Sequence, residues 1–317
     1  MTRCLCCNKI IQNPNDYESK VSWHQKCIKS FFGTVMLPEL DCSDEELEAL
    51  AQSTVNKGLT VPGVQKKLSL HLDTDANVSR LTVVDYPTGY ILKPQSNDFD
   101  HLPEVEYLTM KMAEACRIKT VPNALISSRG KLAYITKRID RSKGKMYAME
   151  DFCQLSGRMT EDKYRGSYEQ CGKIIKKYSQ NIGIDLAELF YRLVFCYVTG
   201  NSDMHLKNFS LIENKPGSRV FGLSEAYDLL PVNIILPADK EQVALTLNGK
   251  KRNLRKKDFF ALAESFELSE KTAQGLMKQV LKYKDVFIEL INQAYIPSEM
   301  KEDYINLISQ RAERFND

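Results

Sequence analysis

The spacing of hydrophobic and polar positions changes along the chain, and this change predicts two different halves. Between residues 59 and 137 the pattern is that of strands, interrupted by one helix of period about 3.6 over 102–118. The predicted strands cover 67–72, 80–85, 89–94, 123–128 and 131–138. A short acidic helix is expected over 41–53, where Ser43 and Glu46 have the capping-box spacing.

Helical patterns dominate after about residue 168. The predicted helices cover 169–179, 184–198, 257–266, 270–294 and 298–315. The chain is therefore predicted to be an α+β protein with a strand-rich N-lobe and a helical C-lobe. We divide it into a knuckle-like segment over 1–40, the N-lobe over 41–140 and the C-lobe over 141–317.

The composition is that of an ordinary globular protein and excludes several classes. Of the 317 residues, 43% are hydrophobic and 27% are charged, and the net charge is +3. Charge this nearly balanced argues against a protein that coats nucleic acid. Because no signal peptide and no run of about 18 apolar residues occurs, we expect a cytoplasmic protein with no membrane partner. The nine cysteines should then be thiols or metal ligands.

The first segment contains a set of potential metal ligands. Cys4 and Cys7 form one pair, His24 and Cys27 form a second pair, and sixteen residues separate the two pairs. Four such ligands suit a tetrahedral structural Zn²⁺ with no open position. A small apolar core would come from Trp23, Phe31 and Phe32. The alternative is a group of unconnected buried thiols, and Cys6 adds ambiguity because it lies between the ligands.

The most informative polar segment is YVTGNSDMHLKNFSL at 197–211, which follows a strongly apolar helix. Asp203 and Asn208 have the D-x-x-x-x-N spacing of a kinase catalytic loop, and Asp228 follows in AYDLLP. Phosphoryl transfer needs a carboxylate that accepts the proton of the attacking hydroxyl, and oxygen ligands for Mg²⁺. Asp203 is the candidate base, and Asn208 and Asp228 are the candidate Mg²⁺ ligands. Each residue alone is more typical of an ordinary loop.

Two upstream features support the same chemistry. Lys93 ends the predicted strand GYILKP, and Glu106 on the next helix is placed to pair with it. Glu104 lies two residues earlier and should face elsewhere on the helix. The segment LTVPGVQKKLSL holds Gly63, but it is a poor glycine-rich loop and by itself indicates only a turn.

Seven segments together resemble the HipA-like toxin kinase family. They are TVPGVQKKLSL (60–70), GYILKPQ (89–95), ITKRIDR (135–141), MEDFCQL (149–155), GNSDMHLKNFS (200–210), YDLLP (227–231) and ALTLNGK (244–250). The resemblance covers about residues 55–315. It implies a two-lobed protein-kinase-like fold and an ATP-dependent serine/threonine kinase with Mg²⁺ as cofactor.

The resemblance also implies roles for single residues. Asp203 would be the catalytic base, Asn208 and Asp228 the Mg²⁺ ligands, and Lys93 the phosphate clamp. The remaining nucleotide contacts would come from Gly63, Glu106, Lys137, Ile139, His205 and Tyr227. Thr60 matches the family's phosphorylated loop serine, so autophosphorylation there is expected to silence the kinase. Pro62 departs from the family pattern, which usually has a small residue at that position.

Partners follow from the resemblance as well. Known substrates of the family are aminoacyl-tRNA synthetases, and an antitoxin from the same operon restrains the kinase. The segment before the phosphate loop is short and unlike that of full-length members, as in the split members called HipT. A separate small protein is therefore expected to supply the missing subdomain, and DNA is expected to be bound only through the antitoxin.

Three other functions are compatible with parts of the pattern. A small-molecule phosphotransferase would use the same Asp and Asn chemistry, and only the resemblance favours a protein acceptor. The two predicted helices within the segment 256–281 could form a DNA-binding helix-turn-helix, although apolar residues every three to four positions favour core packing. A pseudokinase should have lost one of Lys93, Asp203, Asn208 or Asp228, and all four are present.

Overall fold

A computed structural model describes residues 2–40, 67–75, 78–84, 88–128, 130–142 and 144–315. The chain divides into two compact units, of which the first comprises Met1–Tyr107 and Val121–Lys143 and the second Leu108–Thr120 and Gly144–Asp317. The acidic helix predicted over 41–53, and the loop residues Thr60 and Gly63, lie outside the described residues.

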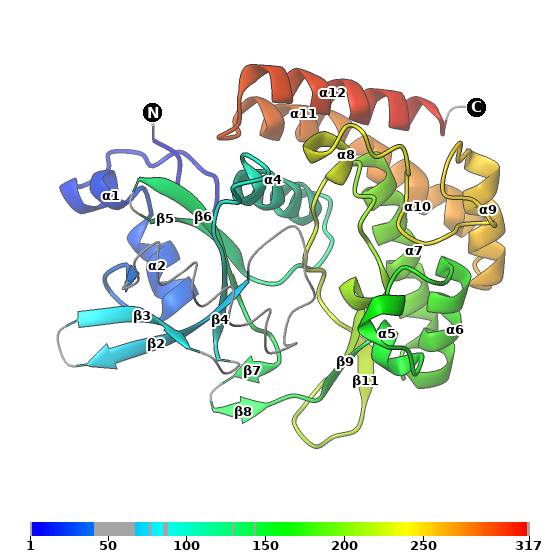
Figure 1. The fold of residues 1–317 in the computed structure, drawn as a ribbon, viewed down its shortest axis with the longest axis horizontal. Coiled ribbons are helices and arrows are strands. Elements are labelled where there is room, and N and C mark those ends of the chain that lie inside the picture. Colours follow the sequence, from blue (N-terminus) through cyan, green and yellow to red (C-terminus); the bar gives the residue numbers. More distant parts are fainter. Residues whose placement is uncertain are drawn as a thin grey trace. The chain divides into compact units, whose positions relative to one another are not determined.

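The first unit is built around a six-stranded sheet with the strand order β1-β3-β2-β4-β6-β5 (Figure 1). The strands are β1 (Glu39–Leu40), β2 (Leu68–Asp75), β3 (Val78–Val84), β4 (Tyr90–Lys93), β5 (Asn123–Ser128) and β6 (Lys131–Lys137). Neighbours are antiparallel except β1, which runs parallel to β3. On β4, Leu92 faces Leu68 and Ile135 across the two ladders, and all three side chains are buried. The five predicted strands are confirmed, whereas β1 was not expected.

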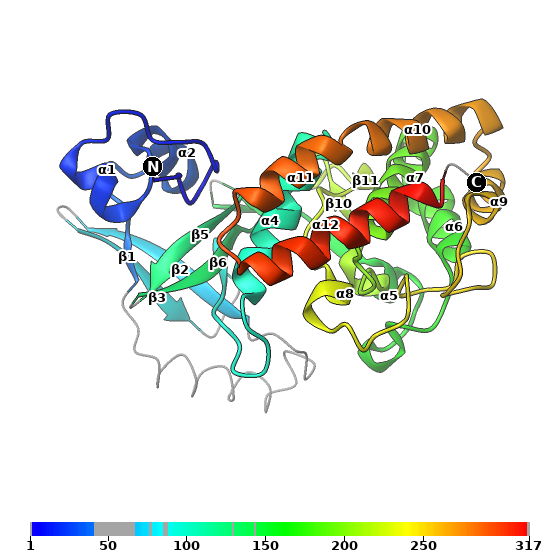
Figure 2. The same cartoon turned by 90° about the horizontal axis from the view of Figure 1, so that it is seen from above.

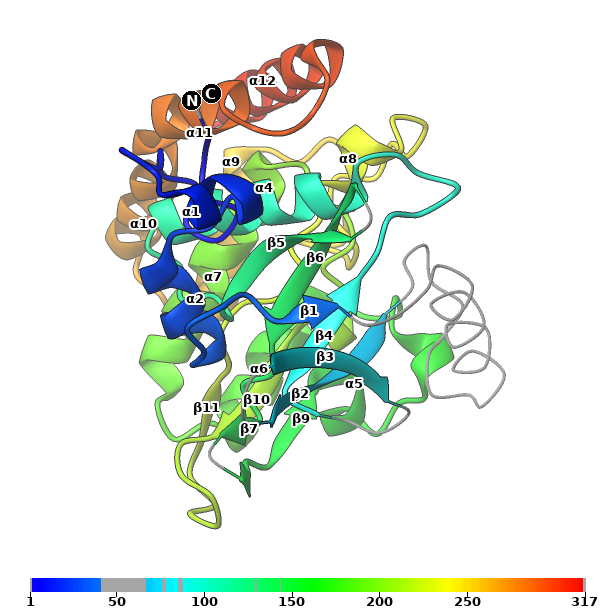
Figure 3. The same ribbon diagram turned by 90° about the vertical axis from the view of Figure 1, so that its left-hand side faces the viewer.

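The N-terminal segment packs on this sheet (Figure 3). It contains α1 (Asp16–Val21), which begins with a capping box between Asn15 and Glu18, and α2 (Gln25–Phe32). The amide of Leu125 on β5 donates to the carbonyl of Leu5 at 2.8 Å. Trp23, Phe31 and Phe32 are buried in mutual ring contact, and the rings of Phe31 and Phe32 lie 6.0 and 5.5 Å from Tyr90 on β4. The predicted aromatic core exists and joins the segment to the sheet.

The boundary between the units passes through α4 (Leu102–Ala115), between Tyr107 and Leu108. Of the apolar positions that predicted this helix, Val105, Leu108 and Met112 are buried, and Ala115 is half-buried. Two short strands, β7 (Arg141–Ser142) and β8 (Lys145–Met146), flank the second passage of the chain between the units.

The second unit is mainly helical and contains a small three-stranded sheet of order β11-β10-β9. Its strands are β9 (Met149–Asp151), β10 (Ser210–Glu213) and β11 (Phe221–Leu223). Its helices are α5 (Phe152–Leu155), α6 (Tyr168–Tyr178), α7 (Ile182–Val198), α8 (Val232–Ile235), α9 (Lys256–Ser265), α10 (Glu270–Lys282), α11 (Lys284–Asn292) and α12 (Ser298–Glu313), with 3₁₀ turns at Thr160–Asp162 and Leu206–Asn208. Every residue of α7 from Leu189 to Val198 is buried, so this helix forms the centre of the unit.

The single helix predicted over 270–294 is wrong, because the chain bends at Tyr283 between α10 and α11. The amide of Tyr283 donates to the carbonyl of Val280 at 3.0 Å, a tight i−3 bond that ends α10. The two helices then pack on different partners, α10 on α7 and α11 on α12 (Figure 2). The buried positions of α10 are Ala273, Met277 and Val280, which fits core packing for this helix. Within the described ranges, no helix has the length and hydropathy needed to traverse a lipid bilayer.

Candidate active site and cysteine–histidine cluster

A buried ion pair lies at the end of β4. The ammonium of Lys93 is 2.5 Å from Oε1 of Glu106 on α4, and the exposed side-chain fractions are 4% and 0%. Lys93 also lies 5.3 Å over the ring of Tyr134. Glu104 instead accepts from the amide of Gln95 at 2.9 and 2.8 Å. The structure therefore selects Glu106 over Glu104 as the partner of Lys93, and both partners belong to the first unit.

The loop that follows α7 in the second unit is fixed by its own polar groups. The amide of Asp203 donates to the Asn201 side chain at 3.0 Å, and Nδ2 of Asn208 donates to the carbonyl of Asp203 at 2.9 Å. The amide of His205 donates to that same carbonyl at 2.7 Å. Because the Asn208 amide nitrogen points back into the loop, its side-chain oxygen is oriented away from this bond. The predicted base and the first predicted Mg²⁺ ligand are thus brought together.

Tyr164 contacts the predicted base and was missed by sequence reasoning. Its hydroxyl donates to Oδ1 of Asp203 at 2.5 Å, and its ring packs edge-on against His205 with centroids 4.9 Å apart. Burial, followed by the charges of Asp203 and Asp228, raises the pKa of the Tyr164 phenol well above its ordinary value. The phenol therefore stays protonated and continues to donate at neutral pH. No spacing rule connects residue 164 with residue 203.

Asp228, the second predicted Mg²⁺ ligand, is half-buried and has a left-handed backbone with φ of 59°. A non-glycine residue in this region is uncommon, and such conformations concentrate at functional sites. The preceding residue is anchored, since the Tyr227 hydroxyl is 2.5 Å from Oγ of Ser210 and 3.1 Å from the carbonyl of Lys207. Tyr227 thus holds the Asp228 segment against the loop that follows α7, and its hydroxyl is used in that contact.

Lys207 in this loop is held by a residue outside the loop. Lys207 forms an ion pair of 2.8 Å with Asp151, and Asp151 caps α5 through Gln154. Asp151 belongs to the segment MEDFCQL (149–155), so this ion pair joins that segment to the loop. Nδ1 of His205 accepts from the amide of Lys207 at 3.3 Å, so the buried imidazole caps the 3₁₀ turn.

Two of the predicted nucleotide contacts, Lys137 and Ile139, lie at the end of β6 and just after it. The Lys137 ammonium donates to the carbonyl of Phe31 at 3.3 Å and lies 5.8 Å over the ring of Tyr90. The side chain of Lys137 is thus directed toward the N-terminal segment, and its backbone amide donates to the carbonyl of Pro122 at 3.0 Å. Ile139 is half-buried beside it.

The predicted metal ligands in the N-terminal segment converge. The ligand atoms of Cys4, Cys7, His24 and Cys27 all lie within 4.8 Å of one another. Nδ1 of His24 is 3.5 Å from Sγ of Cys7 and 3.9 Å from Sγ of Cys27. Hydrogen bonds from the Cys27 and Cys4 thiols lower the pKa of Cys7, whereas hydrogen bonds with Cys27 and Cys7 raise the pKa of Cys4, so the cluster favours a thiolate at Cys7.

Comparisons with known proteins agree on one family. A family model described as the HipA-like C-terminal domain matches residues 59–286. A protein of Haemophilus influenzae is 27% identical over 291 residues, which cover 82% of each chain. A protein of Sinorhizobium fredii is 31% identical over 249 residues, covering 73% of this chain and 59% of its own length. Both relatives are named putative kinases.

Two solved structures show the fold. A chain from the complex of HipA, HipB and operator DNA of Shewanella oneidensis MR-1 has a TM-score of 0.68 and 18% identity, covering 81% of this chain and 65% of that one. The Helicobacter pylori proinflammatory kinase CtkA has a TM-score of 0.56 and 15% identity, covering 78% of this chain and 93% of its own. The predicted α+β, protein-kinase-like fold is therefore confirmed.

Proposed function

Because this chain belongs to the family with the HipA-like C-terminal domain, we propose that it is an ATP-dependent serine/threonine protein kinase and the toxin of a toxin–antitoxin system. The observation that carries the kinase proposal is the buried ion pair of Lys93 and Glu106. Burying a charge is costly, and a strand lysine paired with a helix glutamate is the arrangement by which protein kinases hold ATP phosphates. In this proposal the chain consists of the knuckle-like segment over 1–40, the N-lobe over 41–140 and the C-lobe over 141–317.

In this proposal each candidate residue has a separate chemical role. Asp203 accepts the proton of the attacking hydroxyl, while the Tyr164 hydroxyl holds one of its carboxylate oxygens. Lys93 binds the phosphates. Asn208 and Asp228 offer the oxygen ligands that Mg²⁺ prefers, and bound Mg²⁺ would neutralise phosphate charge. Nucleotide contacts from Gly63, Lys137, Ile139, His205 and Tyr227 complete the proposed site.

The proposed acceptor is a protein, by family resemblance an aminoacyl-tRNA synthetase, which would place the reaction in the cytoplasm. We also propose an antitoxin partner, because the Shewanella oneidensis structure is a complex with HipB and operator DNA. DNA would then be reached only through the antitoxin. A small separate protein is proposed to supply the subdomain that full-length members carry.

The test of this function is transfer of label from γ-labelled ATP in a lysate of the source bacterium. One labelled protein is expected with the wild-type chain, and labelling should fall at least about 100-fold with Asp203→Asn, because an amide cannot accept the proton. Label that persists above a tenth of the wild-type rate would show that Asp203 is not the base. Label found only in small molecules would favour the alternative phosphotransferase.

Zn²⁺ is proposed as a structural cofactor of the N-terminal segment. Zn–S bonds of about 2.3 Å place tetrahedral ligand atoms about 3.5 to 3.8 Å apart. The separations of His24 from Cys7 and Cys27, 3.5 and 3.9 Å, are close to this. The amide of His24 also donates to Sγ of Cys4 at 3.3 Å, an outer contact typical of thiolate ligands.

Autophosphorylation at Thr60 remains part of the proposal, although Thr60 lies outside the described residues. A phosphate would add about −1.5 to −2 charges where the ATP phosphates must approach. Mass spectrometry after incubation with Mg–ATP should find phosphate at Thr60 in wild type and none in Asp203→Asn. An unmodified Thr60 in a preparation that labels its substrate would refute the idea.

A further inference from the structure

Arg311 on α12 is a half-buried cation of the second unit without an acidic partner among the described residues. Its Nη2 donates to Oδ1 of Asn233 at 3.1 Å, and its guanidinium group lies 4.6 Å over the ring of Tyr197. Its Nη1 is buried with no hydrogen-bond partner. Among the residues described by the structure, none forms an ion pair with Arg311. Proteins rarely bury a charge in this way unless an opposite charge is supplied from elsewhere.

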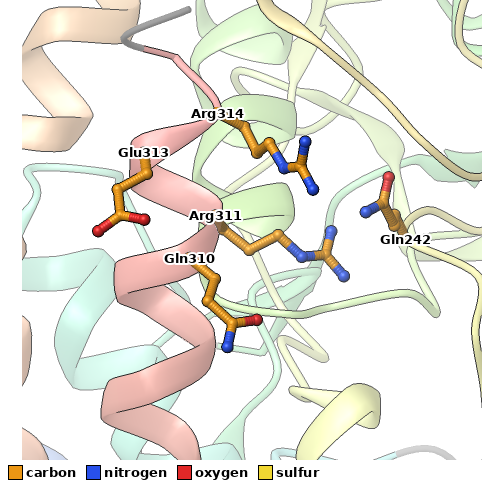
Figure 4. Close-up of a pocket in the computed structure, with 5 residues that line it drawn as sticks. All are labelled: Gln242, Gln310, Arg311, Glu313 and Arg314. Carbon is orange, nitrogen blue, oxygen red and sulfur yellow. The ribbon is translucent and has the colours of Figure 1, made fainter.

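A pocket of about 360 Å³ opens beside this group and is lined by Gln242, Gln310, Arg311, Glu313 and Arg314. Figure 4 shows both guanidinium groups extending from α12 toward Gln242, whereas the Glu313 carboxylate is directed away from them. Oε1 of Gln242 accepts from the amide of Leu254 at 2.9 Å, which leaves the Gln242 amide nitrogen as a donor. The groups that face one another across the pocket are therefore hydrogen-bond donors, two of them cationic.

The position of the two arginines at the end of α12 does not account for the arrangement. Cations in the last turn of a helix interact favourably with its dipole, and this explains Arg314. It leaves Nη1 of Arg311 buried without a partner. Burial lowers the pKa of Arg311 from its ordinary value, the neighbouring Tyr197 hydroxyl opposes this shift, and the charge of Arg314 adds to it. Two full charges also outweigh the partial charge of about −0.5 at the end of a helix.

We propose that this pocket binds a phosphate-sized anion, either inorganic phosphate or a small phosphate monoester. The planar guanidinium groups of Arg311 and Arg314 supply charge-assisted hydrogen bonds in the geometry that suits phosphate oxygens, and Gln242 adds a neutral donor. The bound anion accepts hydrogen bonds from the guanidinium groups that border the pocket and offsets their two like charges.

The pocket is connected to the catalytic loop. Asn233, which accepts from Arg311, also donates its backbone amide to the carbonyl of Gly200 at 3.1 Å, and its side chain is 3.5 Å from Oγ of Ser202. An anion that holds Arg311 in place therefore steadies the segment that carries Asp203. This regulatory consequence rests on the proposed kinase function, whereas binding of the anion does not.

Binding is tested by calorimetric titration of the full chain with inorganic phosphate, with Mg²⁺ and a non-hydrolysable ATP analogue present throughout so that the nucleotide site is filled. One phosphate per chain is expected. Arg314→Gln should weaken it by about tenfold or more, since a hydrogen bond to a charged group is lost. The matched control Arg117→Gln removes an exposed arginine after α4 and should bind as the wild type does. A parallel titration with O-phosphoserine shows whether a monoester binds more tightly than the free ion.

Equal phosphate affinity in wild type and Arg314→Gln, or no binding once the nucleotide site is filled, would overturn the proposal. Arg311→Gln serves as a second variant, and its folding is checked first by circular dichroism. Regulation is measured separately by hydrogen exchange of residues 200–205. Added phosphate should slow this exchange in the wild type and leave it unchanged in Arg314→Gln. If the chain binds phosphate in this pocket but transfers no phosphoryl group, the proposed anion site stands and the proposed kinase function is wrong.

Discussion

At the scale of single residues, the contact between Tyr164 and Asp203 has a direct chemical consequence. A carboxylate that must accept a proton works only when its oxygen points at the acceptor hydroxyl, and the hydrogen bond from Tyr164 fixes its rotation. Tyr164 is 44% exposed, so part of its side chain is open to solvent while its hydroxyl is engaged with Asp203. Tyr164 is therefore best described as a positioning residue for the proposed base.

Tyr164→Phe removes this hydrogen bond and keeps the ring that packs on His205. We expect kcat to fall about tenfold, as for loss of a hydrogen bond to a charged group, with the KM for ATP unchanged. Tyr178→Phe is the matched control, because the Tyr178 hydroxyl forms no hydrogen bond within the described residues. Steady-state kinetics of both variants measure kcat and the KM for ATP. If kcat of Tyr164→Phe equals that of the wild type, Tyr164 does not position the base.

The sequence predicted the candidate residues better than their contacts. Spacing along the chain identified Lys93 with Glu106, and the structure shows that pair in direct contact. The pairs Tyr164 with Asp203 and Lys207 with Asp151 were not predicted, because they join residues 39 and 56 positions apart. Periodicity reports which face of an element is buried, and it carries no information about side chains that meet through a turn of the chain.

At the scale of elements, strands with strong patterns were predicted well and short connecting elements were not. β2 to β6 were found because alternation persists over several residues, whereas β1 and β11 contain two and three residues. The break at Tyr283 was missed because α10 and α11 share one apolar period, and only their different partners bend the chain. Both failures arise where tertiary packing overrides the local pattern.

Close packing of α12 on the loop that follows α7 leads to a prediction about Gly200. Gly200 has φ of 75°, and an added Cβ would lie 2.9 Å from Cδ2 of Leu307. Gly200→Ala should therefore destabilise the chain through both backbone strain and the clash, by about 2 to 4 kcal/mol. Gly217→Ala is the matched control, since Gly217 has φ of 77° with open space around it, and it should cost only about 1 to 2 kcal/mol. Urea unfolding followed by circular dichroism measures both, and equal losses would contradict the packing argument.

The N-terminal segment offers a second prediction at this scale. Its two helices contain six and eight residues, too few to be stable without tertiary support, so the proposed zinc should hold them together. About one equivalent of zinc should co-purify, and Cys27→Ser should lose the metal and expose Trp23 to solvent. Elemental analysis and tryptophan fluorescence are the measurements, with Cys153→Ser as a control in a buried thiol of the other unit. Metal-free protein purified without chelators would leave these cysteines as core thiols.

At the scale of the whole molecule, the fold alone would not decide the function, because a kinase-like fold also accommodates proteins that have lost catalysis. The comparisons show a family and a fold, and the chain spans 59% of the Sinorhizobium fredii relative and 65% of the Shewanella oneidensis chain. The argument for an active enzyme rests on particular side chains: Lys93 buried on Glu106, and Asp203 held by Tyr164. A toxin with these groups intact should act on the cell that makes it.

Induced expression of the wild-type chain in its source bacterium, without its operon neighbours, should therefore arrest growth. Asp203→Asn should be tolerated at the same protein level, because a near-isosteric amide preserves the fold while transfer falls by about 10²- to 10⁴-fold. Asp303→Asn, an exposed acid on α12, is the matched control and should arrest growth as the wild type does. Growth curves and immunoblots measure the two quantities together. Equal growth arrest by Asp203→Asn would mean that the chain acts by binding and not by phosphoryl transfer. If wild-type protein at a high level does not slow growth, the toxin role is excluded. Kinase activity would then still be measured with labelled ATP.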